Sequence, residues 1–144
     1  MKGIKLLDNL EPDFKEECSK ILTNLEKVTG VEWCITQGTR TIAEQDALYA
    51  KGRTTQGDKV TNAKGGQSPH NFNQAIDVCP INPKDGSLWW NAPEKYWVAL
   101  GQMVEGLGDV WGGHFKSILD KPHIEDNDWK DTQTAWKEGK VKIS

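Results

Sequence analysis

Two short segments of the sequence each place a histidine close to an acidic residue. The first (SPHNFNQAID) contains His70 and Asp77, and the second (DKPHIE) contains Asp120 and His123. Imidazole and carboxylate groups are common protein ligands of zinc, and three protein ligands with a fourth position left open for water are typical of a catalytic zinc site. The two segments therefore indicate a catalytic metal centre.

We predict that His70, Asp77 and His123 bind one zinc ion, and that Asp120 is the general base and acid. Zinc lowers the pKa of its water from about 16 to about 7 and polarises a carbonyl oxygen. A carboxylate beside the metal can take the proton of that water and pass it to the leaving amine. Asp77 also lies in an apolar run (AIDVCPI), where an ionised side chain is costly unless it is paired or metal-bound. Each spacing alone, H-x₆-D or D-x₂-H, also occurs by chance.

The predicted secondary structure must bring these residues together. Periodicity and capping signals predict helices at about 10–29, 41–50, 91–107 and 131–139, and strands at 31–36, 75–81, 109–112 and 122–125. The apolar stripe of the first helix extends to Val28, and that of the third extends to Leu107. This order predicts an α+β fold with a small, mostly antiparallel sheet and flanking helices.

The remainder of the sequence limits the kind of protein. Residues 52–68 predict a long surface loop, and such loops are often functional. No linker or repeat divides the chain, so we expect one catalytic domain over residues 1–144. The net charge is −3 with dispersed lysines and arginines, which argues against a nucleic-acid partner. No run approaches the ~18 apolar residues of a membrane span, so we expect no membrane insertion.

The first segment resembles the S-x-H-x-x-G-x-A-x-D signature of zinc peptidases that cut D-amino-acid peptides of bacterial cell walls. This family groups D-Ala-D-Ala dipeptidases, D,D-carboxypeptidases and phage L-alanyl-D-glutamate endopeptidases. Asp120 and His123 match its second motif, an acid followed three residues later by histidine. The stretch 38–80, together with WGGHFKSILDKPHIE, is similar to the phage endolysin branch, and the resemblance covers about residues 30–125.

The resemblance implies a hedgehog/D,D-peptidase-like fold and the same zinc ligands and base that we assigned above. Arg40 matches the arginine of the family's G-x-R-T segment, which implies that it holds substrate or stabilises the oxyanion. Ser68 matches the first position of the signature and is expected to contact substrate. An alternative for Arg40 is an ion pair with an acid such as Asp46.

The sequence departs from the family pattern at two places. Asn73 replaces the signature glycine, and asparagine tolerates the left-handed backbone conformation better than most residues. His114-Phe115 stands where phage relatives often carry Asp-Trp. His114 could be a fourth ligand, a substrate contact or an exposed strand residue, and we favour the last.

Two other residues compete for catalytic roles. Glu125 lies two residues from His123 and would share its face in a strand, so it is a rival for the base, with surface charge as the alternative. A nucleophilic Cys79 near His70 is disfavoured, because Asp77 would occupy the same face of the strand. The three cysteines, an odd number, favour synthesis in a reducing compartment.

The resemblance predicts a zinc-dependent endopeptidase that cleaves the L-alanyl–D-glutamate bond of bacterial peptidoglycan and acts as a phage lysin in host cell lysis. We expect a monomer without a signal peptide, held in the host cytoplasm until it is released to the periplasm and cell wall. One alternative is a D,D-carboxypeptidase or D-Ala-D-Ala dipeptidase with the same zinc centre. Another is a non-catalytic, zinc-stabilised wall-binding module, against which the presence of Asp120 argues.

Overall fold

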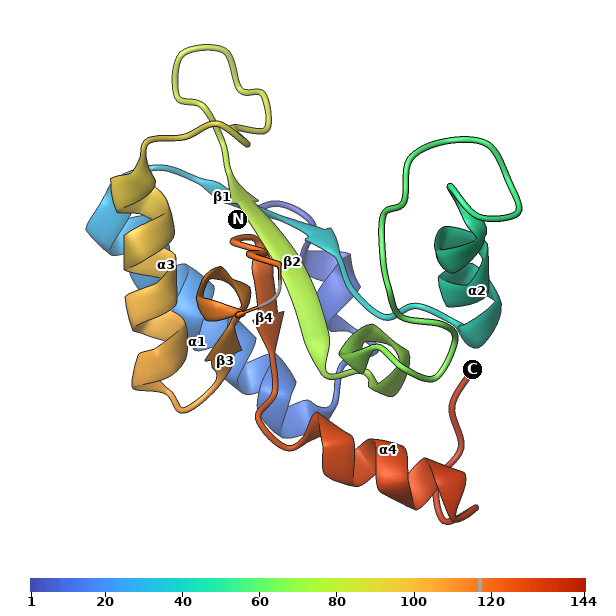
Figure 1. Ribbon diagram of the computed structural model, residues 1–144. Helices are drawn as coiled ribbons and strands as arrows, with labels where there is room; N and C mark the ends of the chain where they lie inside the picture. Colours follow the sequence, from blue (N-terminus) through green and yellow to red (C-terminus); the bar gives the residue numbers. More distant parts are fainter. Residues whose placement is uncertain (117) are drawn as a thin grey trace.

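The structure is a computed structural model that describes residues 1–116 and 118–144 (Figure 1). Its helices and strands follow one another in the order predicted, with three short 3₁₀ helices in addition. In chain order they are η1 (Ile4–Leu7), α1 (Pro12–Thr29), β1 (Trp33–Gln37), α2 (Ile42–Ala50), η2 (Pro69–Phe72), β2 (Ala75–Pro80), α3 (Glu94–Gly106), β3 (Val110–Trp111), η3 (Gly112–His114), β4 (His123–Glu125) and α4 (Trp129–Lys137).

The four strands form one sheet in the order β1-β2-β4-β3, and every neighbouring pair is antiparallel. The α+β class with a small antiparallel sheet is therefore confirmed. In the β2–β4 ladder Asp77 lies opposite His123, and Ile76 lies opposite Ile124. Because side chains alternate between the two faces of a strand, Asp77 and His123 lie on one face and the two fully buried isoleucines on the other.

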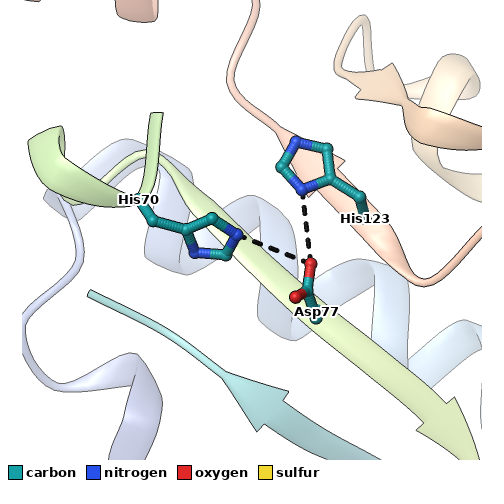
Figure 2. Close-up of side chains that lie close together, drawn as sticks. All are labelled: His70, Asp77 and His123. Carbon is teal, nitrogen blue, oxygen red and sulfur yellow. Dashed lines mark hydrogen bonds and ion pairs between the residues drawn. The ribbon is translucent and has the colours of Figure 1, made fainter. Parts of the chain in front are cut away.

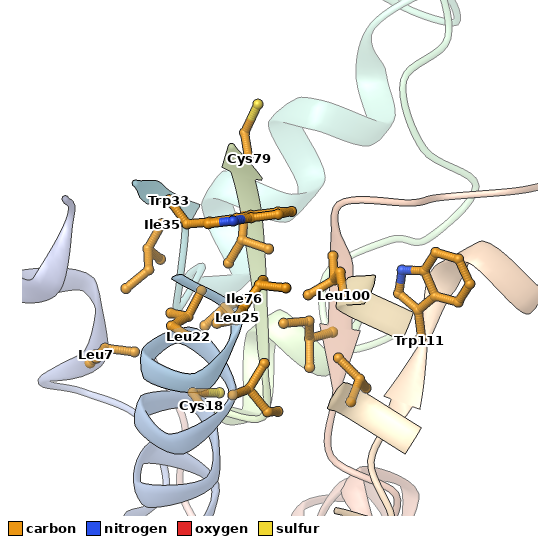
Figure 3. Close-up of a cluster of buried hydrophobic side chains, with 14 of the residues drawn as sticks. Leu7, Cys18, Leu22, Leu25, Trp33, Ile35, Ile76, Cys79, Leu100 and Trp111 are labelled. Atoms are coloured by element: carbon orange, nitrogen blue, oxygen red, sulfur yellow. The ribbon is translucent and has the colours of Figure 1, made fainter. Parts of the chain in front are cut away.

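Helices α1 and α3 lie together against the isoleucine-bearing face (Figure 1). The buried residues of α1 recur at helical spacing, and they pack with Leu100 and Val104 of α3 and with Trp33 and Ile76 of the sheet (Figure 3). Trp33 also meets Trp97 edge to face, with 5.9 Å between ring centroids. This core fixes the sheet that carries the site on its opposite face.

Capping signals locate the ends of the first two helices correctly. Gly30 ends α1 with a φ of 71°. Thr41 begins α2 with the expected capping box, in which its hydroxyl accepts from the Glu44 amide and the Glu44 carboxylate accepts from the Thr41 amide. These helix ends are set by local chemistry, which is why the sequence predicts them.

The predicted apolar stripes were wrong at both helix ends. Val28, in the last turn of α1, is 65% exposed, and Leu107, directly after α3, is 45% exposed, so neither side chain belongs to the core. Helix α4 begins at Trp129, earlier than predicted, where the Trp129 ring stacks on Phe72 of η2 at 6.1 Å. No helix of the described residues combines the length and apolarity needed to cross a bilayer.

Candidate metal centre

Three predicted ligands meet where η2, β2 and β4 come together. The Oδ1 atom of Asp77 lies 3.5 Å from His70 Nε2 and 3.3 Å from His123 Nδ1 (Figure 2). All three candidate donor atoms lie within 4.8 Å of one another. Two imidazoles and one carboxylate therefore converge on a single point.

His70 is positioned by the short helix η2. The Ser68 hydroxyl caps this helix by accepting from the His70 amide at 3.2 Å, and Asn73 ends it in the left-handed conformation with a φ of 62°. Asparagine thus adopts the conformation that the family's glycine would supply. The His70 ring is oriented by Gly38, whose carbonyl oxygen lies 2.8 Å from Nδ1. Because a carbonyl can only accept, Nδ1 carries the hydrogen and the Nε2 lone pair faces Asp77.

His123 is oriented by Glu125. The Nε2 atom of His123 lies 2.8 Å from Glu125 Oε1, and the other carboxylate oxygen of Glu125 accepts from the indole of Trp129 at 2.7 Å. The carboxylate requires a hydrogen on Nε2, which leaves Nδ1 free to bind a metal when the ring is neutral. Both oxygens of Glu125 are engaged in this way, so the geometry favours a positioning role over that of the base.

The charges in the site stabilise one another. Burial would raise the pKa of Asp77, but contacts with His123 and His70 outweigh it and hold that pKa well below its usual range. Burial would lower the pKa of His123, but Asp77 and Glu125 raise it to about 9 in the absence of a metal. Arg40 adds a further positive charge, with Nη2 3.7 Å from Asp77 Oδ2. A bound cation would take the place of the His123 proton as the positive charge that offsets the negative charge of Asp77.

Asp120 lies at the mouth of the same pocket. Its backbone is tied to the site, because its amide donates to the Gly112 carbonyl at 2.9 Å and its carbonyl accepts from the His123 amide at 3.1 Å. Although the side chain is exposed, packing around the carboxyl group raises the pKa of Asp120. A raised carboxyl pKa suits a group that must both accept and donate a proton.

All six residues assigned from the sequence line one pocket of about 390 Å³. They are Arg40, Ser68, His70, Asp77, Asp120 and His123. Val60, Thr61 and Ala63 of the long loop form part of its wall, together with Phe115. The predicted functional role of the 52–68 loop thus corresponds to a wall of the site. Ser68 caps η2 and also lines the pocket, and its contact with substrate stays a prediction.

The donor set fits a zinc ion. Bonds of 2.0–2.1 Å in tetrahedral geometry separate neighbouring ligand atoms by about 3.3 Å. The Asp77 contacts to His123 and His70, at 3.3 and 3.5 Å, are long for hydrogen bonds but close to that separation. The hydrogen bonds to Gly38 and Glu125 hold the protons of the neutral rings on the outer nitrogens. His70 Nε2 and His123 Nδ1, which face Asp77, therefore keep their lone pairs for a metal. His70, Asp77 and His123 could therefore hold the metal and leave a position open.

Several competing interpretations do not agree with the structure. His114 lies in η3 rather than in a strand, is 68% exposed and pairs with Glu105, away from the triad. Burial raises the pKa of Cys79 to about 11, so its thiol is no nucleophile. Asp46 accepts from the Gly65 amide, whereas Arg40 faces Asp77.

One residue of the site was missed by the sequence analysis. Gln45 of α2 is fully buried, accepts from Arg40 Nη1 at 3.2 Å and donates to the Ala63 carbonyl at 2.9 Å. It thereby connects the arginine to the loop wall. A polar residue inside a short helix gives no sequence signal for this role.

Known proteins resemble this chain in both sequence and fold. A model of the D-alanyl-D-alanine carboxypeptidase family, Peptidase M15, matches residues 61–126. The peptidoglycan L-alanyl-D-glutamate endopeptidase CwlK of Bacillus subtilis (strain 168) is 40% identical over 103 residues, which are 67% of this chain and 61% of CwlK. The chain thus spans less than two thirds of that relative's length.

Solved structures share the fold at low identity. The L-Ala D-Glu endopeptidase ChiX of Serratia marcescens has a TM-score of 0.61 and 21% identity, over 92% of this chain and 90% of ChiX. The vancomycin resistance D,D-pentapeptidase VanY, a mutant in complex with Zn(II), has a TM-score of 0.56 and 13% identity, over 90% of this chain and 79% of VanY.

Proposed function

We propose that this chain is a member of the D-alanyl-D-alanine carboxypeptidase family M15, whose model matches residues 61–126, and that it is a zinc-dependent endopeptidase. Its proposed reaction is cleavage of the L-alanyl–D-glutamate bond of peptidoglycan stem peptides. The proposal rests chiefly on the meeting of His70, Asp77 and His123 in one pocket with Asp120. The 40% identity to CwlK supports the choice of bond.

The residues of the pocket divide the chemistry between them. His70, Asp77 and His123 would hold zinc, which when bound lowers the pKa of water and polarises the scissile carbonyl. Asp120 accepts the proton of the attacking water and donates it to the amine nitrogen of D-glutamate as the peptide bond breaks. A carboxyl with a raised pKa can carry the proton between these two positions.

Arg40 supplies a fixed positive charge near the developing oxyanion. Its side chain is held by Gln37, Gln45 and Asp77, so little reorganisation accompanies the reaction. Its guanidinium has further N–H groups for a substrate carboxylate or carbonyl. The same residue can therefore serve in substrate binding and in oxyanion stabilisation.

The biological setting that we propose is phage-induced host lysis. The similarity of stretch 38–80 to the phage endolysin branch supports it. In this setting residues 1–144 act as one monomeric catalytic domain, kept in the host cytoplasm until it reaches the peptidoglycan.

A D,D-carboxypeptidase is the second candidate, because the matching family carries that description. Mass spectrometry of digested peptidoglycan distinguishes the two. New amino ends on D-glutamate are expected, whereas release of D-alanine or its dipeptide would support the second candidate. A protein that binds zinc and cell wall but releases no fragment would instead be a binding module.

A further inference from the structure

A row of buried polar side chains crosses the sheet on the face opposite the metal centre. Asp126 follows β4 and its amide donates to the Gln74 carbonyl at 2.9 Å, which continues the β2–β4 ladder by one step. The β3–β4 register, Val110 opposite Glu125, places Asp109 beside Asp126 on the other side. Gln74, Asp109 and Asp126 are 2%, 5% and 7% exposed.

These three residues lie on the core face, against α1. They are an even number of positions from Ile76, Trp111 and Ile124 along their strands, so they share the face of those core residues. From α1, Glu17 contacts the carboxyl group of Asp109. The cluster of Glu17, Gln74, Asp109, Asp126 and Asp128 is thus separated from His70, Asp77 and His123 by the sheet itself.

The negative charge of this cluster has no cationic partner in residues 1–116 and 118–144. The four carboxylates, Glu17, Asp109, Asp126 and Asp128, make none of the ion pairs found there. Their only amide partner is Gln74, whose Nε2 donates to Asp126 Oδ2 at 3.0 Å and to Asp128 Oδ1 at 2.7 Å. Asp109 and Asp126 are buried, whereas Glu17 is half-buried and Asp128 is exposed. Buried charge of one sign, as on Asp109 and Asp126, is strongly unfavourable without a counter-charge.

Two buried oxygens in the cluster also lack any hydrogen-bond donor. They are Oδ2 of Asp109 and Oε1 of the neutral side chain of Gln74. Buried polar atoms are nearly always paired, and an orphaned one indicates an absent partner. The partner needed here must be attracted to oxygen atoms and must carry positive charge.

We propose that Glu17, Asp109 and Asp126, with the side-chain oxygen of Gln74, form a binding site for a divalent, oxygen-preferring cation such as Ca²⁺. Ca²⁺ takes 6–8 oxygen ligands from carboxylates, amide carbonyls and water, and it tolerates irregular geometry. In this structure the amide nitrogen of Gln74 faces the carboxylates, so its oxygen reaches the cation only after a half-turn of the amide, and this turn gives up the hydrogen bonds to Asp126 and Asp128. The bound cation would connect α1 to the ends of β2, β3 and β4.

The alternative occupant of the cluster is a proton shared between two carboxyls. Burial, and then contact with Glu17, raise the pKa of Asp109 to about 9. A cation and this proton would compete for the same oxygens. The two states differ in their response to calcium, so an experiment can separate them.

Thermal unfolding of the zinc-loaded protein in calcium-depleted buffer tests the proposal, with CaCl₂ as the titrant. Zinc keeps the catalytic site filled, so the readout is independent of peptidase activity and of the proposed function. Saturating Ca²⁺ is expected to raise the Tm by about 5–10 °C. NaCl at matched ionic strength should do much less, and an equal rise would overturn the proposal because it would show screening only.

Variants locate the site. Asp109→Asn and Asp126→Asn should abolish the calcium shift, whereas Asp58→Asn, at an exposed loop position, should retain it. If Asp109→Asn does not fold, Glu17→Gln on the half-buried turn of α1 serves the same purpose. A wild-type Tm unmoved by 10 mM Ca²⁺ would overturn the proposal in favour of the shared proton. A calcium shift that survives all of these variants would place the ion elsewhere.

Discussion

Asp77 of β2 and His123 of β4 are direct partners in the antiparallel ladder, and their side chains meet at 3.3 Å on one face of the sheet. The two residues are 46 positions apart in the sequence. The ladder sets the separation of their donor atoms, and the core on the opposite face holds the ladder. The metal centre is therefore rigid before any metal binds, as a pre-organised catalytic site requires.

The first prediction concerns the metal. Purified protein should contain about one zinc ion per chain, and His70→Ala should lose both zinc and cell-wall digestion, because one of three ligands is removed. Metal content by elemental analysis and turbidity of a cell-wall suspension measure the two effects. The exposed His114 is the matched control, and His114→Ala should keep the zinc. Digestion that persists after zinc is chelated would disprove the metal assignment.

The second prediction concerns the base. Asp120→Asn should keep the zinc but lower kcat by about 10²–10⁴-fold, because the amide cannot accept the proton of water. Asp131→Asn, at an exposed position in the first turn of α4 outside the pocket, is the control and should keep full activity. Single-turnover hydrolysis of a stem-peptide fragment provides the measurement. An active Asp120→Asn together with an inactive Glu125→Gln that still binds zinc would transfer the role of base to Glu125.

The parts of this molecule that the sequence predicts well depend on local signals. The stripe of α1, the Thr41 capping box and the conformation of Asn73 each follow from the residue and its near neighbours. The metal ligands were found because they lie in two short motifs. Their common position on the sheet face then follows from the alternation of side chains along β2 and β4.

The parts that the sequence did not predict depend on contacts between distant segments. The start of α4 at Trp129 follows from stacking on Phe72, and the role of Glu125 follows from its position between His123 and Trp129. The buried row that contains Asp109 and Asp126 requires the register of three strands. No local pattern carries such information, because each of these residues alone is typical of an exposed loop.

The third prediction concerns the outer partner of His123. Glu125→Ala should weaken zinc affinity by about 10–100-fold, because the ring loses the acceptor that fixes its orientation. Glu125→Gln should recover part of the affinity, since its amide oxygen can still accept from Nε2. Competition with a chromophoric chelator measures the affinity, with Glu105→Ala, beside His114, as the control. Unchanged zinc affinity in Glu125→Ala would show that Glu125 does not position His123 for zinc binding.

The fourth prediction concerns stability and pH. The pKa of Asp109 is raised to about 9, from an ordinary value of 3.8, so the folded protein binds more protons than the unfolded chain between these values. Without calcium, this residue therefore makes the free energy of unfolding fall as the pH rises from about 4 to about 9. After burial, the facing groups Glu17 of α1 and Asp126 and Asp128 after β4 contribute to this raised pKa of Asp109, because their negative charges disfavour its ionised form.

Urea unfolding at pH 6 and pH 9 measures this dependence. Asp109→Asn should flatten it, because the neutral amide has no proton to lose, and Asp58→Asn should leave it unchanged. Calcium should stabilise the wild type more at pH 9 than at pH 6, because the proton occupies Asp109 less at the higher pH. A wild-type slope equal to that of Asp109→Asn would show that the residue is ionised at neutral pH.

The last prediction concerns Gly112, which lies beneath the base. A Cβ atom at this position would lie 2.2 Å from the Asp120 carbonyl oxygen and 2.9 Å from the Cβ of His123. Gly112→Ala must therefore push the Asp120 loop away from β4, which should cost about 1–3 kcal/mol of stability. It should also lower kcat more than zinc content, because the loop carries the base while β4 stays in the sheet.

Gly106→Ala, at the end of α3, is the control for this prediction, because a Cβ atom there meets no atom within 4 Å. Denaturant unfolding, zinc content and kcat for both variants complete the test, and a Gly112→Ala protein as active as Gly106→Ala would contradict the placement of Asp120.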